Sequence, residues 1–349
     1  MPINFASDNW AGAHPAITQA LAENAPGFAA AYGLSDLDRK VEERFCEIFE
    51  REVAVFFVAT GTAANALSMA LINRPGGVVF CHEHAHMVED EGGAPEYLTG
   101  GARTHGVAGA RGRIDGQALE RAIAQFPAAF VHAGQPMAVS LTQATEIGTV
   151  YSLDAIAAIA GICRAHGLPL HMDGARFANA LVALETTPAQ MTWRSGVDIV
   201  SFGATKNGCW CAEAIVVMDP AKARDMPFLR KRAAHLFSKS RFIAAQFEGY
   251  FRDDLWLANA RHANAMAAQL ADILDRAAAT RLAWQPQTNE VFALMGEQTA
   301  AALRERGIFF HPWAVPRDMT ARAGEGLYRF VTSFATTRED LSALAAALG

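Results

Sequence analysis

Residues 168–176 read LPLHMDGAR, and residues 197–208 read VDIVSFGATKNG. Each stretch joins a short apolar run to a turn with chemically reactive side chains, first Asp173 and Arg176 and then Lys206. Short apolar runs bounded by turn residues are typical of strands that are buried on both faces of a parallel sheet. Ligands bind at the carboxyl ends of the strands in such sheets, so the sequence predicts a binding site after these two runs.

Strands and helices alternate over most of the first 250 residues. Residues 35–49 repeat apolar side chains at helical spacing behind a capping box that starts at Ser35, and residues 153–166 form a second clear helix between a Ser152 cap and Gly167. A further helix is predicted at residues 115–126. The predicted strands cover residues 53–58, 78–81, 128–132, 168–172, 197–202 and 214–218. This alternation indicates an α/β fold with a mostly parallel sheet.

The pattern changes at about residue 253. A long alanine-rich helix comes first, and a last helix follows Thr337. Between them, strands are predicted at residues 290–295, 308–311 and 328–334. We therefore expect a large domain at residues 1–252, including an N-terminal arm, and a small C-terminal α+β domain at residues 253–349.

The composition narrows the class of protein. The chain has 349 residues, of which 51% are hydrophobic and 19% charged, and its net charge is −6 without a long run of either sign. This is a globular composition with no electrostatic footprint for nucleic acid. Residues 53–73 are uncharged but interrupted by polar side chains, so we expect a buried strand and helix there and no membrane partner. An odd count of five cysteines and a start without an export signal favour a cytoplasmic location.

Three features after predicted strands fit one cofactor. Gly61 and Thr62 open a helix whose first amides suit a phosphate, Asp173 supplies an anion, and Lys206 supplies an amine in a small uncharged neighbourhood that favours its nucleophilic form. Taken singly, these are also an ordinary turn, a helix cap and a surface lysine. Together they meet the needs of pyridoxal 5′-phosphate (PLP): a Schiff-base amine, an anion near the ring nitrogen and amides for the phosphate.

The chain resembles the low-specificity L-threonine aldolases, which are grouped with the aromatic amino acid β-eliminating lyases. The resemblance extends over essentially the whole chain. The residues that carry it are Phe5-Ala6-Ser7-Asp8, Tyr32-Gly33, Gly61-Thr62 with Asn65, Ala85-His86, Glu91-Gly92-Gly93, His171-Met172-Asp173-Gly174-Ala175-Arg176, Lys206 and Arg329-Phe330-Val331-Thr332. It implies the PLP-dependent transferase-like (fold type I) architecture for the large domain.

The resemblance also implies roles at the cofactor. His86 stacks on the pyridine ring, Asp173 faces its nitrogen, and Lys206 forms the Schiff base. Arg176 borders the cofactor, and Arg241 reaches the phosphate from a neighbouring subunit, although its window departs from the glycine-rich family version. A homotetramer with active sites near subunit interfaces follows from the same resemblance.

At the substrate, the resemblance implies that Ser7, Arg176 and Arg329 hold the carboxylate, with Tyr32 also in contact. An arginine fork suits a carboxylate because two parallel N–H bonds fix its orientation. The implied reaction cleaves L-threonine, L-allo-threonine and related β-hydroxy-α-amino acids, phenylserine included, to glycine and an aldehyde.

The base that accepts the hydroxyl proton is left open by the sequence. Many family members have a second histidine where this chain aligns Gln143-Ala144-Thr145-Glu146, so Glu146 stands in its place. The candidates are His86, Glu89, His132 and Glu146.

Three other functions remain possible on the sequence. The same cofactor supports β-elimination or transamination. The alternate histidines His82, His84 and His86 would lie on one side of an extended strand and suit a metal-dependent hydrolase. A non-catalytic binding protein on the same fold would leave the pair Asp173 and Lys206 unused.

Overall fold

The computed structural model describes residues 2–127, 129–317 and 319–349. Its centre is a seven-stranded sheet in the order β2-β8-β7-β6-β5-β3-β4. The strands are β2 (Ala54–Val58), β3 (Gly77–His82), β4 (Arg103–Val107), β5 (Gln135–Thr142), β6 (Leu170–Gly174), β7 (Ile199–Gly203) and β8 (Glu213–Val217). Neighbours pair in parallel except at β8, which is antiparallel to both β2 and β7. The predicted mostly parallel sheet is confirmed.

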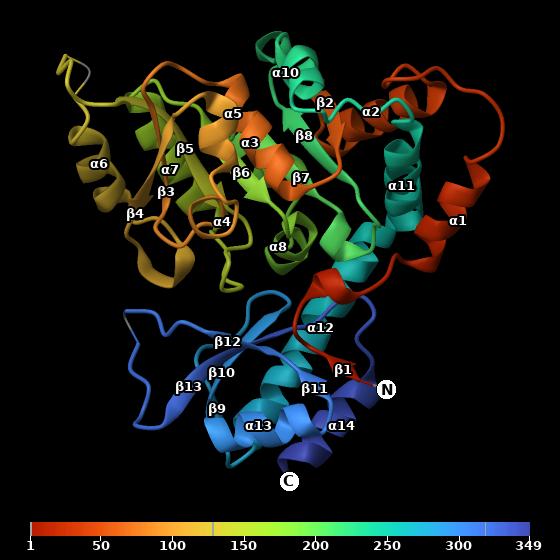
Figure 1. The fold of residues 1–349 in the computed structure, drawn as a ribbon, viewed down its shortest axis with the longest axis vertical. Coiled ribbons are helices and arrows are strands. Elements are labelled where there is room, and N and C mark those ends of the chain that lie inside the picture. The colour runs from red at the N-terminus through yellow and green to blue at the C-terminus, as the bar shows by residue number, and fades with distance from the viewer. Residues whose placement is uncertain (1, 128, 318) are drawn as a thin grey trace.

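Helices cover both faces of this sheet (Figure 1). On one face, α3 (Gly61–Leu71) packs with α5 (Ala94–Thr99) and α10 (Met226–Arg232). The other face carries α2 (Asp36–Ile48), α6 (Gly116–Ala124), α7 (Leu153–Ala165), α8 (Phe177–Ala183) and α11 (Arg241–Phe251). The remaining helices of this part are α1 (Pro15–Glu23), α4 (His86–Glu89) and α9 (Pro188–Met191). The sheet is therefore enclosed, as its apolar strands require.

The predicted helix ends are confirmed. The Ser35 hydroxyl accepts the Asp38 amide, and the Asp38 side chain bonds back to Ser35, which completes the capping box of α2. The Ser152 hydroxyl caps α7 by accepting the Ala155 amide, and Gly167 follows that helix with a positive φ of 65°.

The predicted strand at residues 128–132 is wrong. Residue 128 lies outside the described residues, while residues 129–132 form turns in which the Phe130 amide bonds to the Pro127 carbonyl. The strand begins at Gln135, which pairs with Gly77 of β3. Phe130 and Val131 are exposed, so this apolar run finds no sheet neighbour to cover it.

The C-terminal residues form a smaller α+β unit below the large sheet (Figure 1). The long helix α12 (Leu255–Arg276) leads into an antiparallel sheet, and two helices complete the unit, α13 (Glu297–Glu305) and α14 (Arg338–Leu348). That sheet has the order β12-β13-β10-β9, with β9 (Thr280–Leu282), β10 (Glu290–Gly296), β12 (His311–Trp313) and β13 (Glu325–Val331).

The N-terminus belongs structurally to this smaller unit. Strand β1 (Ile3–Asn4) pairs in parallel with β11 (Ile308–Phe309), and Phe5 is buried in the small unit's apolar core. The chain then crosses to the large sheet, so its first residues run between the two units. The division at residues 252 and 253 stays a prediction.

Residues 53–73 form strand β2 and helix α3, as expected. Within the described part of the chain, no helix is long and apolar enough to cross a membrane.

Candidate active site

A cavity of about 290 Å³ lies at the carboxyl edge of the large sheet. The turns after β2, β5, β6 and β7 and the first residue of β8 all open into it, because antiparallel β8 brings its amino end to this edge. The lining residues are Asn9, Ala59, Thr60, Gly61, Thr62, Asn65, His86, Thr142, Ala144, Glu146, Asp173, Ala175, Arg176, Thr205, Lys206 and Glu213.

Two carboxylates share one amide in the floor of this cavity. Asn65 Nδ2 donates to Asp173 Oδ2 at 2.8 Å and to Glu91 Oε1 at 2.7 Å. The Ala175 amide donates to Asp173 Oδ1 at 3.0 Å, which fixes the turn after β6. Asp173 is therefore held in one orientation with its negative charge inside the cavity.

His86 is held against the same acidic group. Its Nδ1 lies 2.9 Å from Glu91 Oε1, and this hydrogen bond raises the pKa of the His86 imidazole above its usual value, with Asp173 adding to the effect. The same hydrogen bond engages Nδ1 and fixes the orientation of the His86 ring.

Lys206 lies in the short helix η4 (Thr205–Asn207) after β7. Asn207 is buried and donates to the Tyr250 hydroxyl at 2.7 Å and to the Trp256 carbonyl at 2.8 Å. The Thr205 hydroxyl accepts the Ala212 amide at 3.1 Å. These bonds anchor both neighbours of Lys206, so its amine is presented to the cavity from a rigid turn.

Glu213 faces the same space and was missed by the sequence reasoning. Burial raises the pKa of its carboxyl to about 7, opposed by Thr205 and Lys206. A signal was present, because a carboxylate directly before the apolar run 214–218 is unusual for a buried strand.

The turn after β2 fits a phosphate. Thr60 caps α3 by accepting the Ala63 amide at 3.1 Å, which leaves the Gly61 and Thr62 amides at the helix start facing the cavity. A Cβ built on Gly61 meets nothing within 4 Å, so the turn has open space beside it. With the anion of Asp173 and the amine of Lys206 lining the same cavity, the residues fit PLP.

Arg176 closes the cavity toward the small unit. It binds Asp8 with two hydrogen bonds, 2.8 Å from Nε and 3.1 Å from Nη2. Glu290 of β10 lies 3.4 Å from Arg176 and 3.8 Å from Arg329 of β13. The predicted carboxylate-binding arginines therefore lie on either side of a common acidic residue, and Ser7 directly precedes Asp8 in the arm that crosses between the units.

Glu146 reaches the cavity from the loop after β5. Its Oε1 accepts the His86 amide at 2.8 Å and the Thr142 hydroxyl at 2.9 Å, while Oε2 is buried without a hydrogen-bond partner among the described residues. Burial raises the pKa of Glu146 to about 7, with Asp173 adding to the shift. Such a carboxyl group gains and loses a proton near neutral pH.

Of the other candidate bases, Glu89 bonds to the exposed His84 at 2.6 Å, outside the cavity lining. His132 lies before the start of β5, at the opposite edge of the sheet from the cavity, and is exposed.

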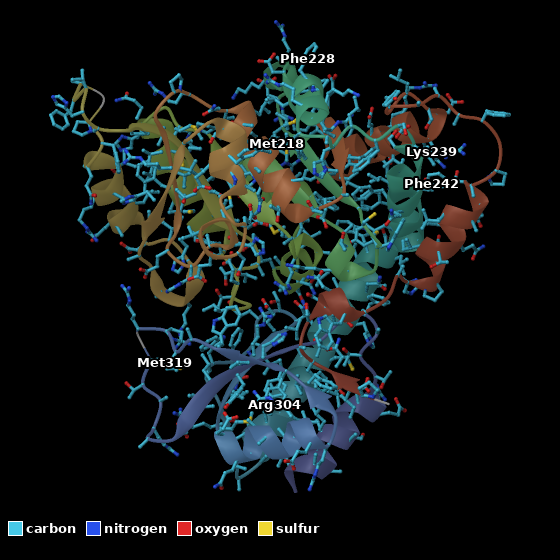
Figure 2. All side chains as sticks on the ribbon, viewed as in Figure 1. Met218, Phe228, Lys239, Phe242, Arg304 and Met319 are labelled. Carbon is cyan, nitrogen blue, oxygen red and sulfur yellow. The ribbon has the colours of Figure 1, made fainter. Side chains whose placement is uncertain are left out.

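Two predicted site residues, Arg241 and Tyr32, are not among the residues that line this cavity in their own chain. Arg241 donates to the Ala25 and Gly27 carbonyls, and its neighbours Lys239 and Phe242 lie on the outer side of the large unit at the start of α11 (Figure 2). The Tyr32 amide bonds to the Ser238 carbonyl of the same region, and its ring is half exposed.

The histidines proposed for a metal turn to separate partners. His82 Nε2 lies 3.1 Å from the Gly109 carbonyl, His84 is paired with Glu89, and His86 with Glu91. Among the residues that the structure describes, no group of three or more histidine, cysteine or acidic side chains has the arrangement of a metal site. The described residues therefore give no geometric support to the hydrolase alternative.

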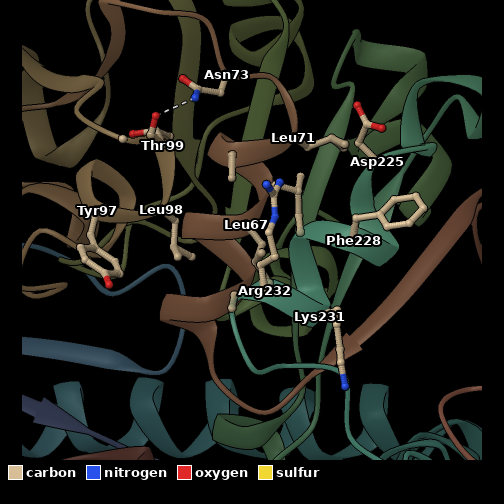
Figure 3. A pocket seen from close by; sticks show the side chains of 14 residues that line it. Leu67, Leu71, Asn73, Tyr97, Leu98, Thr99, Asp225, Phe228, Lys231 and Arg232 are labelled. Atoms are coloured by element: carbon tan, nitrogen blue, oxygen red, sulfur yellow. Dashed lines mark hydrogen bonds between the residues drawn. The ribbon is translucent and has the colours of Figure 1, made fainter.

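A larger cavity of about 940 Å³ lies between α3, α5 and α10 (Figure 3). Tyr97 and Phe228 border it and are exposed, and Asn73 donates to the Thr99 carbonyl at 2.7 Å. Its lining includes Lys231 but no buried carboxylate, because Asp225 is exposed, and its glycine, Gly100, ends helix α5 and does not open a helix. We therefore place the chemistry in the smaller cavity.

The chain is similar to known proteins over nearly its full length. The family model described as β-eliminating lyase matches residues 4–298. The low specificity L-threonine aldolase of Pseudomonas aeruginosa is 39% identical over 98% of this chain and 95% of that protein, and the enzyme of a Pseudomonas species is 37% identical over 98% and 96%. A solved threonine aldolase of Leishmania major superposes with a TM-score of 0.91 at 28% identity, over 99% of this chain and 98% of that chain. The chain therefore belongs to the β-eliminating lyase family, in the group that includes the low-specificity L-threonine aldolases.

Proposed function

We propose that this protein is an aldolase that cleaves L-threonine, L-allo-threonine and related β-hydroxy-α-amino acids, phenylserine among them, to glycine and an aldehyde. The enzymes of its family depend on PLP. The observation that carries the proposal is one cavity that joins Lys206, Asp173, Glu146 and the arginine Arg176. Relatives that are similar over the full length carry the name of this activity.

The residues that would hold the cofactor are Lys206 by its amine, Asp173 at the ring nitrogen, His86 at the ring face, and Gly61 and Thr62 at the phosphate. When bound, PLP supplies an aldehyde for the amino group and a ring that accepts electrons from the bond that breaks. Asp173 keeps a negative charge in place for a protonated ring nitrogen, because the Asn65 and Ala175 donors hold its two oxygens.

Arg176 and Arg329 would hold the substrate carboxylate, with Ser7 beside them. Both arginines lie at the boundary between the two units, where a bound carboxylate would be gripped from both sides. By fixing the carboxylate, the two arginines would set which bond of the substrate is aligned for cleavage, and in this way they would select the reaction.

Glu146 is our proposed base for the β-hydroxyl proton. Its free Oε2 is buried in the cavity wall, and its pKa of about 7 lets it accept a proton at neutral pH. His86 is the weaker candidate because its Nδ1 is already engaged by Glu91 at 2.9 Å and its ring would face the cofactor. The His86 amide in turn holds Glu146 Oε1 in place.

The oligomer and the cell compartment belong to the proposal too. We propose a homotetramer in which Arg241 and Tyr32 act at a neighbouring subunit's site, since neither lines the cavity of its own chain. A cytoplasmic location is supported by five free cysteines.

The test is product formation from L-threonine by the PLP-loaded protein. Acetaldehyde is measured by coupled reduction and glycine by amino acid analysis. We expect equal amounts of both, and we expect loss of both in Lys206→Ala. The matched control is Lys222→Ala, which removes an exposed lysine near the other edge of the sheet.

Other products would contradict the aldolase. Ammonia and a keto acid without glycine would indicate β-elimination, and transfer of the amino group to an added keto acid would indicate a transaminase. Activity that survives Lys206→Ala and disappears with a chelator would favour the hydrolase.

A further inference from the structure

Glu290 is a buried carboxylate that forms a close ion pair with neither of its two arginine neighbours. Its Oε1 lies 3.4 Å from Arg176 Nη2 and 3.8 Å from Arg329 Nη1, both too long for a strong ion pair. The side chain is completely buried, and within the described part of the chain neither carboxylate oxygen has a hydrogen-bond partner. Nε of Arg329 is likewise buried and unpaired among these residues.

Asp8, by contrast, is a fully hydrogen-bonded partner of Arg176. It takes two hydrogen bonds from Arg176 and a third from Asn289 Nδ2 at 3.0 Å. Arg176 thus has a complete carboxylate partner already. Glu290 is an additional acid to which no described residue donates a hydrogen bond. A buried charge without such a partner lowers the stability of the folded protein.

In the PLP-loaded protein, the carboxylates and arginines around Glu290 balance only without a ligand. Asp8 comes from the N-terminal arm, Arg176 from the start of α8 and Arg329 from β13, whereas the nearby Lys206 would give its amine to the cofactor and so adds no charge of its own to this group. With Asp8 and Glu290 ionised, the two arginines are neutralised. A substrate carboxylate bound between them would then add an uncompensated negative charge to a buried cluster.

A proton on Glu290 removes this conflict. Burial already raises the pKa of Glu290 above its usual value, although Arg176 and Arg329 oppose the shift and Asp8 adds to it. A second carboxylate beside it would raise that pKa further. The protonated group could also donate a hydrogen bond, which the ionised group cannot.

We propose that Glu290 takes up one proton from solvent when a substrate carboxylate binds to Arg176 and Arg329. Glu290 touches no reacting atom and acts through the two arginines, as a positioning residue that makes amino acid binding dependent on pH. The inference rests on the proposed function because it uses the same carboxylate site. Proton uptake makes the Kd rise with pH, by up to about tenfold per pH unit between the pKa values of the free and the bound state.

The test uses propionate, which has the carboxylate but no amino group to react with the cofactor. Its binding to the PLP-loaded protein is measured by calorimetry between pH 7 and 9, in phosphate and in Tris, whose ionisation heats differ. The difference in heat counts the protons taken up. Glu290→Gln keeps the shape of the side chain without its charge, and Glu305→Gln is the control at an exposed glutamate.

We expect the wild type and Glu305→Gln to take up a substantial fraction of one proton and to lose affinity as the pH rises. Glu290→Gln should take up none, and its Kd should vary less than about twofold. Wild-type binding without proton uptake overturns the proposal even if Glu290→Gln fails to fold, and so does equal uptake by a folded Glu290→Gln. Absence of propionate binding overturns it too. Failure of the aldolase proposal appears separately, as proton uptake without glycine formation from threonine.

Discussion

Glu146→Gln should strongly reduce threonine cleavage while leaving the site assembled. Glutamine retains an oxygen for the His86 amide and the Thr142 hydroxyl but cannot accept the substrate proton. General bases contribute about 10²- to 10⁴-fold to the rate. At about 1.36 kcal/mol per tenfold, the variant loses about 3 to 5 kcal/mol of transition-state stabilisation.

The pH profile identifies the group that is lost. A carboxyl group with a pKa of about 7 is roughly nine-tenths ionised at pH 8 and roughly one-tenth ionised at pH 6. Because the base must be ionised, wild-type kcat should fall about tenfold from pH 8 to pH 6 through this group. The residual activity of Glu146→Gln should lack this acid limb.

Glycine binding is the internal control, because glycine has the carboxylate and amine but no β-hydroxyl. Its Kd, followed by cofactor absorbance, should change less than about twofold in Glu146→Gln. The exposed Glu43→Gln should match the wild type in every measurement. The reasoning is refuted if Glu146→Gln keeps more than about a tenth of the wild-type kcat with the same acid limb, since another group must then be the base.

Three further variants test the site and the core. Asn65→Ala removes the amide donor that Asp173 and Glu91 share. Hydrogen bonds to charged groups contribute about 1.5 to 3 kcal/mol, so we expect PLP to bind at least about tenfold more weakly in a titration of the apoprotein. Asn73→Ala, beside the other cavity, should bind PLP with the wild-type affinity. Gly203→Ala places a Cβ 2.7 Å from the Ala175 carbonyl oxygen and 2.8 Å from the Ala175 Cα, so the turn that carries Arg176 must shift. We expect a higher KM for threonine and a fall of about 1 to 3 kcal/mol in the free energy of unfolding measured with urea. Gly12→Ala should show neither effect, because its Cβ meets no atom within 4 Å. Phe45→Ala removes a buried ring whose centroid lies 5.2 Å from that of Phe202, 5.2 Å from that of Phe247 and 5.1 Å from that of Phe251. We expect the free energy of unfolding in urea to fall by about 3 to 5 kcal/mol. An equal loss in the exposed Phe28→Ala would disprove this packing argument.

The residues predicted best from the sequence are those that follow parallel strands. Gly61, Asp173 and Lys206 each come after an apolar run, and the carboxyl ends of parallel strands share one edge of the sheet. Their meeting therefore depends only on strand direction. Glu213 does not fit this rule because β8 is antiparallel, so the first residue of the strand reaches the cavity. An apolar run of five residues carries no information about the direction of its strand.

The sequence does not indicate that Asp8 and Glu290 contact Arg176, for a different reason. Asp8 and Arg176 are 168 residues apart, and Glu290 joins them from a different structural unit. No spacing rule connects such residues, because their contact depends on how the arm crosses between the units. The error at residues 128–132 has the same origin. The apolar run was real, but only the pairing of Gln135 with Gly77 decides where the strand begins.

The environment of each carboxylate separates those that hold charge from those that exchange protons. Although burial raises the pKa of Asp8, the Arg176 guanidinium lowers it below the usual value, so Asp8 stays ionised and fixes the arginine. Glu146 is enclosed with one free oxygen and titrates near pH 7. Glu290 has no hydrogen-bond donor among the described residues, and its pKa is raised.

Acids with such different surroundings can serve different steps at one pH. We therefore assign the orientation of bound groups to Asp8 and Asp173 and proton transfer to Glu146. Glu290 would compensate the charge of a bound substrate carboxylate. Glu146→Gln should change kcat and spare propionate binding, while Glu290→Gln should change the pH dependence of binding and spare the pH dependence of kcat. If both variants altered the same parameter, the two glutamates would form one coupled group, and the separation of roles would be wrong.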